Sequence, residues 1–262
     1  MNGCEGYDAI AQVYEGLNRD IDYEGWADFF ERCFDRYLES RPELVLDLAC
    51  GTGRMTRVLR SRGYDMIGVD GSADMLSEAY AAGGEGILYL LQDMRELELY
   101  GTVGAVVCCL DSLNYLLDRK DLAKVFSLVH NYLDPDGLFL FDMNTPYKFK
   151  EIYGNCAYIL EDEMEEEEGE SRAVFCGWQN EYHPETEICD FYLSVFQEKE
   201  DGSYSRSDEH QRERCYSRET VEALLEENGF SLLGVWKDFE GSAPDETTER
   251  WYAVARAIKD KQ

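Results

Sequence analysis

The sequence predicts an α/β fold in which a mostly parallel sheet is covered by helices on both faces and is interrupted by an antiparallel insert. From Glu43 onward, short apolar runs alternate with helical segments, and these runs are apolar throughout, which is typical of parallel strands buried on both faces. After Asn144 this alternation stops and longer, two-sided strands follow. With 262 residues, 44% of them hydrophobic, the chain has enough apolar material for one large domain carrying an insertion.

The amino-terminal half supplies most of the expected sheet. Aromatic residues at helical spacing predict two helices within 7–38, the second from about Asp22 to Leu38. Arg41-Pro42 ends this helix, because proline disfavours helical geometry in the residue before it. The strands expected next are Leu44–Ala49, Met66–Asp70, Ile87–Gln92, Ala105–Leu110 and Gly137–Met143. The helices expected between them are Arg54–Ser61, Ala73–Ala81 and Lys120–Tyr132.

The remaining residues predict the insert and the end of the sheet. Turn signals such as Asp201-Gly202-Ser203 predict antiparallel strands over 156–216. Ser217 caps a helix that ends at Asn228-Gly229, and strands Phe230–Lys237 and Arg250–Ile258 follow. We therefore expect a core of residues 1–146 and 216–262, with a helical cap over 1–40, and an antiparallel β insertion over 147–215.

Charge and composition exclude several classes of protein. With 55 acidic and 25 basic residues the formal charge is −30, whereas nucleic-acid binders and anionic-membrane binders need a basic face. No run approaches the roughly 18 apolar residues of a membrane span, and the first five residues lack the features of an export signal. The nine cysteines contain no Cys-x-x-Cys pair, so we expect no metal site and reduced thiols in a cytoplasmic protein.

The stretch with the clearest chemistry is the turn after the first strand. A buried strand runs into Gly51-Thr52-Gly53 and a helix begins directly after it, so bare backbone can approach a ligand there. Asp70 ends the next strand, 17 residues beyond Gly53, where a carboxylate can accept hydrogen bonds from two ribose hydroxyls. This order predicts a nucleoside cofactor at the carboxyl edge of a parallel sheet.

The residues around this turn favour one cofactor over others. A dinucleotide site usually has a third glycine where this chain has Thr56, and a phosphate-binding P-loop needs a Gly-Lys pair that does not occur here. Asp47, just before the turn, would repel a phosphate but suits a ligand that carries an ammonium or sulfonium group. These departures favour S-adenosylmethionine over NAD, and a NAD-dependent reductase is the poorer alternative.

The stretch Asp47-Leu48-Ala49-Cys50-Gly51-Thr52-Gly53 resembles the acid-x-Gly-x-Gly-x-Gly signature of the class I S-adenosylmethionine-dependent methyltransferases, with Ala49 in place of the first glycine. The resemblance covers about residues 40–145 together with the closing helix and strands. It implies a Rossmann-like, doubly wound, mostly parallel seven-stranded sheet that ends in an antiparallel hairpin. It also implies S-adenosylmethionine as cofactor and S-adenosylhomocysteine as product.

The same resemblance assigns roles to site residues. Gly51 and Gly53 would pass under the methionine moiety, Asp70 would bind the ribose, Met75 would flank the adenine, and Asp93 would bond its amino group. Residues 110–115 would lie beside the transferred methyl group. The implied cofactor-binding set is Asp47, Ala49, Gly51, Thr52, Gly53, Asp70, Gly71, Met75, Gln92, Asp93, Met94, Leu110, Asp111 and Asn114.

Several of these residues also have a purely structural interpretation. Asp70 could be a helix N-cap and Asp93 a turn former. Met75 could be a core residue, while Asn114 and Tyr115 could be a cap and a core aromatic. The acidic run 161–170 either steers a cationic substrate or protects a solvated hairpin edge.

The methyl acceptor is less clearly indicated. The Asn/Asp-Pro-Pro-Tyr/Phe loop of amino-adenine and amino-cytosine methyltransferases is absent, as is the Pro-Cys pair of cytosine-C5 enzymes, so we expect a small molecule methylated at nitrogen or oxygen. The alternatives are a peptide or protein side chain, or a non-catalytic module that binds the cofactor. Tyr7 and Tyr14 share one helical face, and a similar amino-terminal helix closes over the cofactor in small-molecule members of the family.

We expect aromatic hydroxyls to wall the acceptor pocket, although the same rings could simply pack the helix onto the core. No catalytic residue is fixed, because alignment and desolvation are the main demands of methyl transfer. Two of the three histidines, His183 and His210, could act as a base if they point inward, whereas His130 has no partner in view. The candidate orienting residues are Tyr14, Tyr115 and Tyr7, with Tyr23 as a further wall residue.

Overall fold

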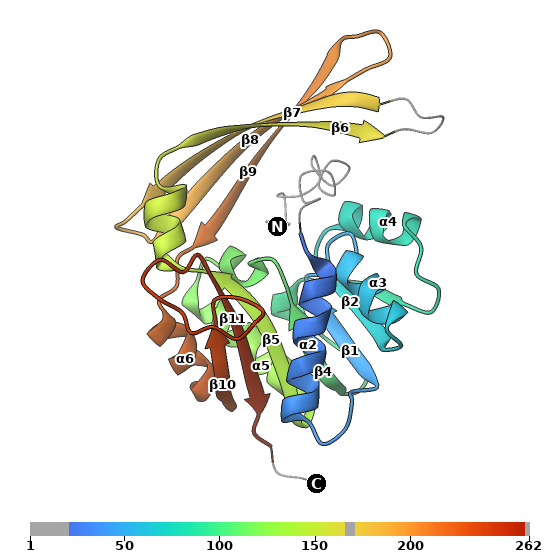
Figure 1. The fold of residues 1–262 in the computed structure, drawn as a ribbon, viewed down its shortest axis with the longest axis vertical. Helices are drawn as coiled ribbons and strands as arrows, with labels where there is room; N and C mark the ends of the chain where they lie inside the picture. Colours follow the sequence, from blue (N-terminus) through green and yellow to red (C-terminus); the bar gives the residue numbers. More distant parts are fainter. Residues whose placement is uncertain (1–20, 166–170, 260–262) are drawn as a thin grey trace.

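The computed structural model describes residues 21–165 and 171–259, which form two separate β-sheets (Figure 1). The main sheet has seven strands in the spatial order β10-β11-β5-β4-β1-β2-β3. Strands β1 to β5 run parallel to one another, whereas β11 pairs antiparallel with both β5 and β10. The strand bounds are β1 Leu44–Leu48, β2 Asp65–Asp70, β3 Leu88–Leu91, β4 Val103–Cys108, β5 Leu133–Asn144, β10 Phe230–Trp236 and β11 Arg250–Ala257.

Helices cover both faces of this sheet, so the predicted doubly wound, Rossmann-like class is confirmed. Apolar side chains of α2 and α3 pack on one face, and those of α5 and α6 pack on the other. Short helical turns η1, η2 and η3 follow β3, β4 and β5. The bounds are α2 Tyr23–Tyr37, α3 Arg54–Ser61, α4 Ala73–Ala81, η1 Met94–Glu96, η2 Ser112–Tyr115, α5 Arg119–Tyr132, η3 Lys148–Tyr153 and α6 Arg218–Glu227.

The strands after η3 form the antiparallel second sheet that the sequence predicts, in the order β6-β7-β8-β9. Figure 1 shows this sheet arching over one end of the main sheet. One of its faces buries an apolar cluster that includes Phe149 of η3, Cys176, Phe191 and Leu193. The bounds are β6 Ala157–Glu165, β7 Ser171–His183, β8 Ile188–Glu198 and β9 Tyr204–Arg214.

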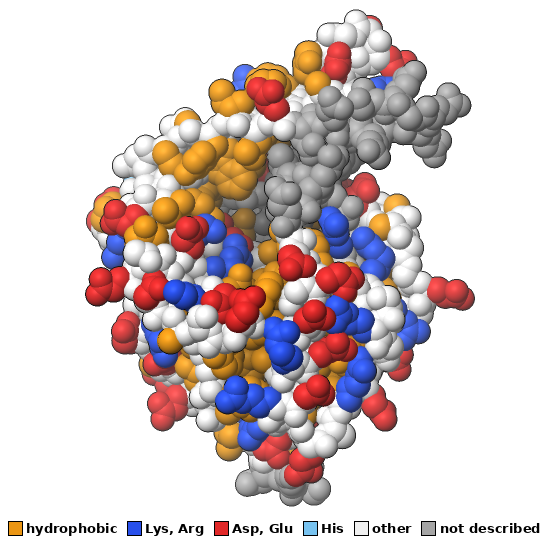
Figure 2. Space-filling view, in the orientation of Figure 1, with side chains coloured by type: hydrophobic (Ala, Val, Ile, Leu, Met, Phe, Trp, Pro, Cys, Tyr) orange, Lys and Arg blue, Asp and Glu red, His pale blue; other side chains and the backbone are white. Residues whose placement is uncertain are grey.

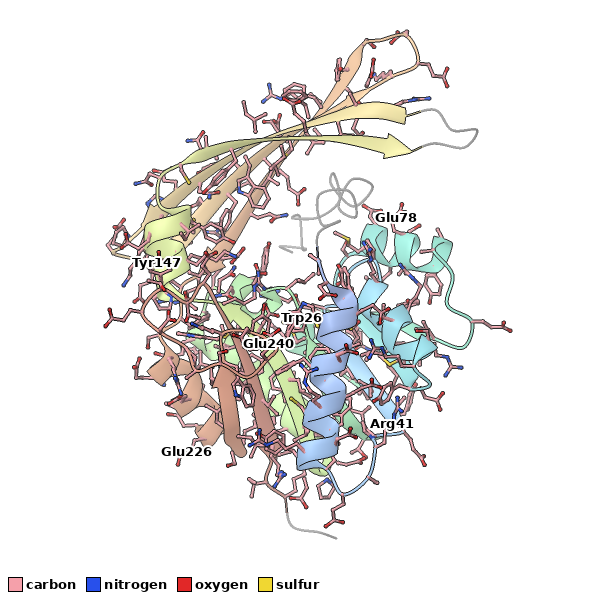
Figure 3. All side chains as sticks on the ribbon, in the orientation of Figure 1. Trp26, Arg41, Glu78, Tyr147, Glu226 and Glu240 are labelled. Carbon is pink, nitrogen blue, oxygen red and sulfur yellow. The ribbon has the colours of Figure 1, made fainter. Side chains whose placement is uncertain are left out.

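Helix α2 shows why the aromatic spacing near the amino terminus is helical. Asp22 caps it, because its carboxylate accepts a hydrogen bond from the backbone N–H of Gly25 at 2.8 Å. Trp26, labelled in Figure 3, is buried and lies 5.2 Å from Phe239 and 5.0 Å from Tyr252, ring centre to ring centre. The apolar face therefore binds the helix to the β10–β11 end of the sheet. The other helix predicted within 7–38 falls on residues outside the described part of the chain.

The solvent-facing side of α2 is tied to its neighbour by charge. Arg62, directly after α3, forms ion pairs with Asp28 at 2.6 Å and Glu31 at 2.8 Å, and with Glu24. Figure 2 shows the same interleaving of basic and acidic side chains across this face. Exposed pairs contribute little individually, so this network mainly fixes how the two helices align.

Strand β5 begins earlier than the sequence predicts, at Leu133 and not at Gly137. Leu133 pairs with Val103, and the register then shifts before Leu138 pairs with Ala105. Asp136 in between has a left-handed backbone, with φ of 64°, so the strand contains an irregularity just before the predicted start at Gly137.

Three further observations concern only the part of the chain that the structure describes. No helix there is long and apolar enough to cross a membrane. The eight cysteines there are free thiols, most of them buried. No group of His, Cys, Asp and Glu residues there has the geometry of a metal site.

Candidate functional site

The glycine turn lies between β1 and α3, and its backbone requires small residues. Ala49, Gly51 and Gly53 have positive φ angles of 60°, 54° and 72°. A side chain at Gly53 would clash with the Tyr89 hydroxyl, whereas nothing lies within 4 Å of the place where a Cβ on Gly51 would be. Because α3 begins at Arg54, its first N–H groups are directed toward the turn. Gly51 is thus open to a ligand, and Gly53 is packed against the protein.

Asp70, at the end of β2, holds the turn in place. Its two carboxylate oxygens accept hydrogen bonds from the backbone N–H of Gly51 at 2.7 Å and of Ser72 at 2.8 Å. Burial raises the pKa of Asp70, although these backbone bonds oppose the rise. Each oxygen of a carboxylate can accept a further hydrogen bond, so Asp70 can also bind hydroxyl groups of a ligand.

Asp47 is a fully buried acid directly before the turn. The Thr56 hydroxyl donates a hydrogen bond to its Oδ2 at 2.5 Å. Burial raises the pKa of Asp47 to about 7, the Thr56 hydrogen bond lowers it, and the nearby charge of Asp70 adds to the rise. A buried acid with a pKa near neutrality favours a cationic ligand, because such a ligand stabilises the ionised form.

Asp93 occupies the corresponding position after β3. The Arg95 side chain donates through Nε to both of its oxygens, at 2.9 and 3.0 Å, and the Arg95 backbone N–H donates at 2.8 Å. Arg95 therefore lowers the pKa of Asp93 and keeps it a carboxylate. Met75 of α4 and Met94 of η1 line one cavity together with Asp93.

These groups surround a cavity of about 320 Å³ at the carboxyl ends of the parallel strands. This is the place where open α/β sheets bind ligands, and the volume suits a small organic molecule. Part of strand β9 closes the opposite side. The predicted cofactor-binding and wall residues that line the cavity are Tyr23, Asp47, Ala49, Gly51, Thr52, Asp70, Gly71, Met75, Asp93, Met94, Leu110 and Tyr115.

Four predicted cofactor residues do not line this cavity: Gly53, Gln92, Asp111 and Asn114. Gln92 instead bonds within its own loop, where its side-chain amide donates to the Glu98 carbonyl at 3.1 Å. The candidates Tyr7 and Tyr14 lie outside the described residues.

Asp111 and Asn114 belong to a second, buried polar cluster behind the cavity. Arg250 of β11 forms an ion pair with Asp111 at 2.8 Å and another with Asp142 of β5. Asn144 donates from its side-chain amide to Asp111 at 2.9 Å, and its backbone N–H donates to Asn114 at 3.0 Å. Leu110 and Asp111 have positive φ angles of 60° and 54°, and Asp111 turns toward Arg250.

The cavity also has wall residues for which the sequence gave weaker signals. Arg54 carries a cation at the start of α3, where acids are the usual choice, and its guanidinium lies 4.8 Å above the Tyr23 ring. Gln211 enters from β9 and accepts a hydrogen bond from the Tyr115 hydroxyl at 2.9 Å. Tyr23 and Tyr115 also border the cavity, whereas the sequence analysis does not single out Gln211, because β9 is polar on both faces.

The histidines are placed away from the cavity interior. His210 borders the cavity, but its ring lies on the opposite face of β9 from the Gln211 side chain, since adjacent strand residues point to opposite faces. There its Nε2 is 2.5 Å from Asp190, and its ring stacks on Tyr192 with centroids 4.7 Å apart. His183 contacts the same Asp190 at 3.1 Å. Both imidazoles are therefore engaged with Asp190 and do not meet the condition of pointing into the cavity as a base.

The fold and the site together define a nucleoside-binding α/β protein, and comparison with known proteins identifies which kind. The family described as a methyltransferase domain matches residues 45–137. A protein of Bacillus subtilis (strain 168), named only as a methyltransferase, is 32% identical over 258 residues, which cover 97% of this chain and 98% of the relative. An S-adenosylmethionine-dependent methyltransferase structure from Clostridium acetobutylicum is 31% identical, with a TM-score of 0.82 and 97% and 99% of the two chains covered.

A third relative has a more specific name. The dTDP-3-amino-3,6-dideoxy-alpha-D-glucopyranose N,N-dimethyltransferase of Streptomyces fradiae is 31% identical over 141 residues, covering 54% of this chain and 52% of the relative.

The chain belongs to the class I S-adenosylmethionine-dependent methyltransferases, and it is a methyltransferase that uses S-adenosylmethionine as cofactor. The residues present fit this cofactor. The open backbone at Gly51 can accept the ligand closely, and the buried acid Asp47 suits a positively charged group.

Proposed function

We propose that this enzyme transfers a methyl group from S-adenosylmethionine to a nitrogen or oxygen atom of a small molecule held between the main sheet and strand β9. The observation that carries the proposal is the 320 Å³ cavity, which has the glycine turn on one side and β9 on the other. A cavity of this size, bordered on one side by strand β9 of the inserted sheet, suits a small acceptor better than a protein chain. The aminosugar relative supports the same class of acceptor.

In this proposal the cofactor lies along the carboxyl ends of β1, β2 and β3. Gly51 and its neighbour Thr52 approach the methionine moiety, Asp70 accepts hydrogen bonds from the ribose, and Asp93 lies by the adenine. Arg54 lines the same cavity, and we assign it the role of binding the methionine carboxylate, because a guanidinium and a carboxylate are opposite in charge and complementary in geometry. Apolar contacts and shape come in part from predicted cofactor residues that also line the cavity, namely Ala49, Gly71, Met75, Met94 and Leu110.

The catalytic contribution of the chain is alignment and exclusion of water. The cofactor supplies an activated methyl group, so the displacement needs a correctly placed nucleophile more than a strong base. We assign the insertion 147–215 the role of a substrate lid, because Gln211 of β9 bonds to Tyr115 of the core loop across the cavity wall. Tyr115 is the orienting residue in the described part of the chain, and Tyr7 and Tyr14 stay predictions.

The experiment combines binding and turnover. Calorimetry with S-adenosylhomocysteine tests the cofactor half: wild type should bind, and Asp70→Ala should bind at least tenfold more weakly, because it loses hydrogen bonds to the ligand and its hold on the turn. Release of S-adenosylhomocysteine is then measured with small amines, alcohols and short peptides as acceptors, and the products are weighed by mass spectrometry. Methylation of peptides alone would contradict the small-molecule proposal.

A further inference from the structure

Strand β9 lies at an edge of the second sheet, so none of the described strands pairs with the far side of its backbone. Three consecutive residues of this strand, His210, Gln211 and Arg212, line the cavity. Neighbouring side chains of a strand point to opposite faces, so these three side chains cannot all reach one cavity from the same face. The three residues share the strand edge, and the backbone edge of β9 therefore forms part of the cavity wall.

The pairing of β9 with β8 decides which backbone groups point to this edge. Just after β9, the backbone N–H of Cys215 donates to the Glu187 carbonyl at 2.8 Å. At the other end, the backbone N–H of Lys199 donates to the Ser203 carbonyl at 2.7 Å. Both pairs continue the antiparallel register of the two strands. Backbone groups of alternate residues face the partner strand in such a pair, so odd-numbered residues of β9 face β8 and even-numbered residues face away.

The outward groups of β9 reach first the core and then the cavity. Asn114 of the core loop donates from its side-chain amide to the carbonyl of Arg214 at 2.8 Å, which agrees with the outward direction of even-numbered residues. The next outward residue is Arg212, which lines the cavity. No hydrogen bond within residues 21–165 and 171–259 uses the outward N–H or carbonyl of Arg212. The cavity wall therefore offers a backbone donor and a backbone acceptor side by side.

We infer that the free edge of β9 binds the methyl acceptor through the backbone N–H and carbonyl of Arg212, and that the acceptor carries an aminoacyl unit, an N–H and a carbonyl that flank one carbon atom. This unit is complementary, because residues that exchange two hydrogen bonds across an antiparallel pair each contribute one N–H and one carbonyl. A carboxylate would bind the N–H of Arg212 but be repelled by its carbonyl, and an ammonium group would bind only the carbonyl. The inference rests on the proposed function and names the class of its small-molecule acceptor.

The aminoacyl unit is a recognition group and not the methylated atom. An amide nitrogen is a poor nucleophile, because its lone pair is delocalised into the carbonyl. Two backbone hydrogen bonds fix the position and rotation of the unit, so a nucleophilic nitrogen or oxygen elsewhere in the acceptor is held in a defined place. The two outward residues that line the cavity, His210 and Arg212, span roughly 7 Å, which suits a small molecule with one such unit better than an extended peptide.

The test uses N-acetyl-L-alanine N′-methylamide, a probe that contains the aminoacyl unit and no nucleophilic amine or hydroxyl. Its counterpart methylated at the alanine nitrogen lacks the N–H and is the matched control ligand. Binding to the enzyme saturated with S-adenosylhomocysteine is followed by ¹⁵N–¹H NMR, because the Arg212 amide signal reports directly on a bond to its N–H. This signal should shift with the probe, and the control ligand should bind about fivefold more weakly, the scale of one hydrogen bond.

The variants separate the backbone of residue 212 from its side chain. Arg212→Pro removes the outward N–H without removing a bond to β8, and proline is tolerated at such edge positions. It should weaken probe binding about fivefold. Arg212→Ala shortens the side chain but keeps the N–H, so its effect should be smaller. Asp208→Pro is the matched control, because Asp208 is an outward residue of the same edge, is 58% exposed and does not line the cavity. It should leave probe binding unchanged.

An Arg212 signal that does not move with the probe would overturn the inference, whether or not the proline variant folds. Equal binding of the two ligands would overturn it as well. So would a loss in Arg212→Ala or in Asp208→Pro as large as that in Arg212→Pro, because the outward N–H at residue 212 would then not be the group that binds. None of these results affects the proposed function, which fails instead if wild type does not bind S-adenosylhomocysteine.

Discussion

Cofactor affinity should depend on pH through Asp47. This acid is fully buried at the cavity wall, and burial raises its pKa to about 7. A cation binds better to the ionised carboxylate than to the neutral acid, so protons compete with the cofactor below this pKa. The affinity should therefore rise as the pH increases through 7, because deprotonation creates the form that attracts the cation.

The size of the effect follows from the pKa. With a value of about 7, roughly one tenth of Asp47 is ionised at about pH 6 and roughly nine tenths at about pH 8. If only the ionised form binds well, the affinity for S-adenosylmethionine rises about tenfold over this range, or about 1.4 kcal/mol. Calorimetry at several pH values between these limits measures it directly.

The matched variant is Asp47→Asn, which keeps the shape of the side chain and removes its titration. Its affinity should be independent of pH in this range and close to that of wild type at the acidic limit. The variant should also gain stability relative to wild type as the pH rises from the ordinary aspartate pKa of 3.8 to the folded-state pKa of about 7. Over this window the unfolded state loses its proton more readily than the folded state, so ionisation of the buried acid destabilises the wild-type fold. Equal affinities of the wild type at both limits, or the same pH profile in the variant, would refute the reasoning.

Two further predictions concern stability and are checked by urea unfolding. Gly51→Ala should lower the free energy of unfolding by about 1–2 kcal/mol, because alanine is strained at a left-handed position. Gly53→Ala should lower it by about 1–3 kcal/mol more, because the added Cβ also meets Tyr89. Equal losses in the two variants would contradict the difference in packing between the two positions. Arg250→Met should cost about 3–5 kcal/mol at neutral pH because it strands Asp142 without its cation. That loss should shrink as the pH falls, since the carboxyl group can then be protonated, and a loss that does not vary with pH would count against the ion pair.

The parts of the site that could be predicted from sequence depend on local signals. A glycine turn between a buried strand and a helix specifies its own geometry, and this is why Gly51 and Asp70 lie together at the cavity. The order of strands and helices follows equally from periodicity within each segment. These features need no knowledge of contacts between distant parts of the chain.

The parts that could not be predicted depend on such contacts. The sequence of the loop after β4 does not show that Asp111 turns away from the cavity, because its partner Arg250 is 139 residues further along. In β9 both faces are polar, so alternation carries no information about which face is buried. No local feature of the sequence therefore marks Gln211, because its hydrogen-bond partner Tyr115 lies 96 residues earlier in the chain.

The two walls of the cavity come from separate parts of the sequence, and this affects how the acceptor specificity of the enzyme can evolve. The glycine turn and its acids come from the first hundred residues, whereas the Gln211 side comes from a strand encoded far downstream. Replacing the segment 204–214 would change the cavity wall that faces the methyl acceptor and leave the cofactor-facing wall intact. A scaffold built in this way lends itself to diversification by recombination as readily as by single substitutions.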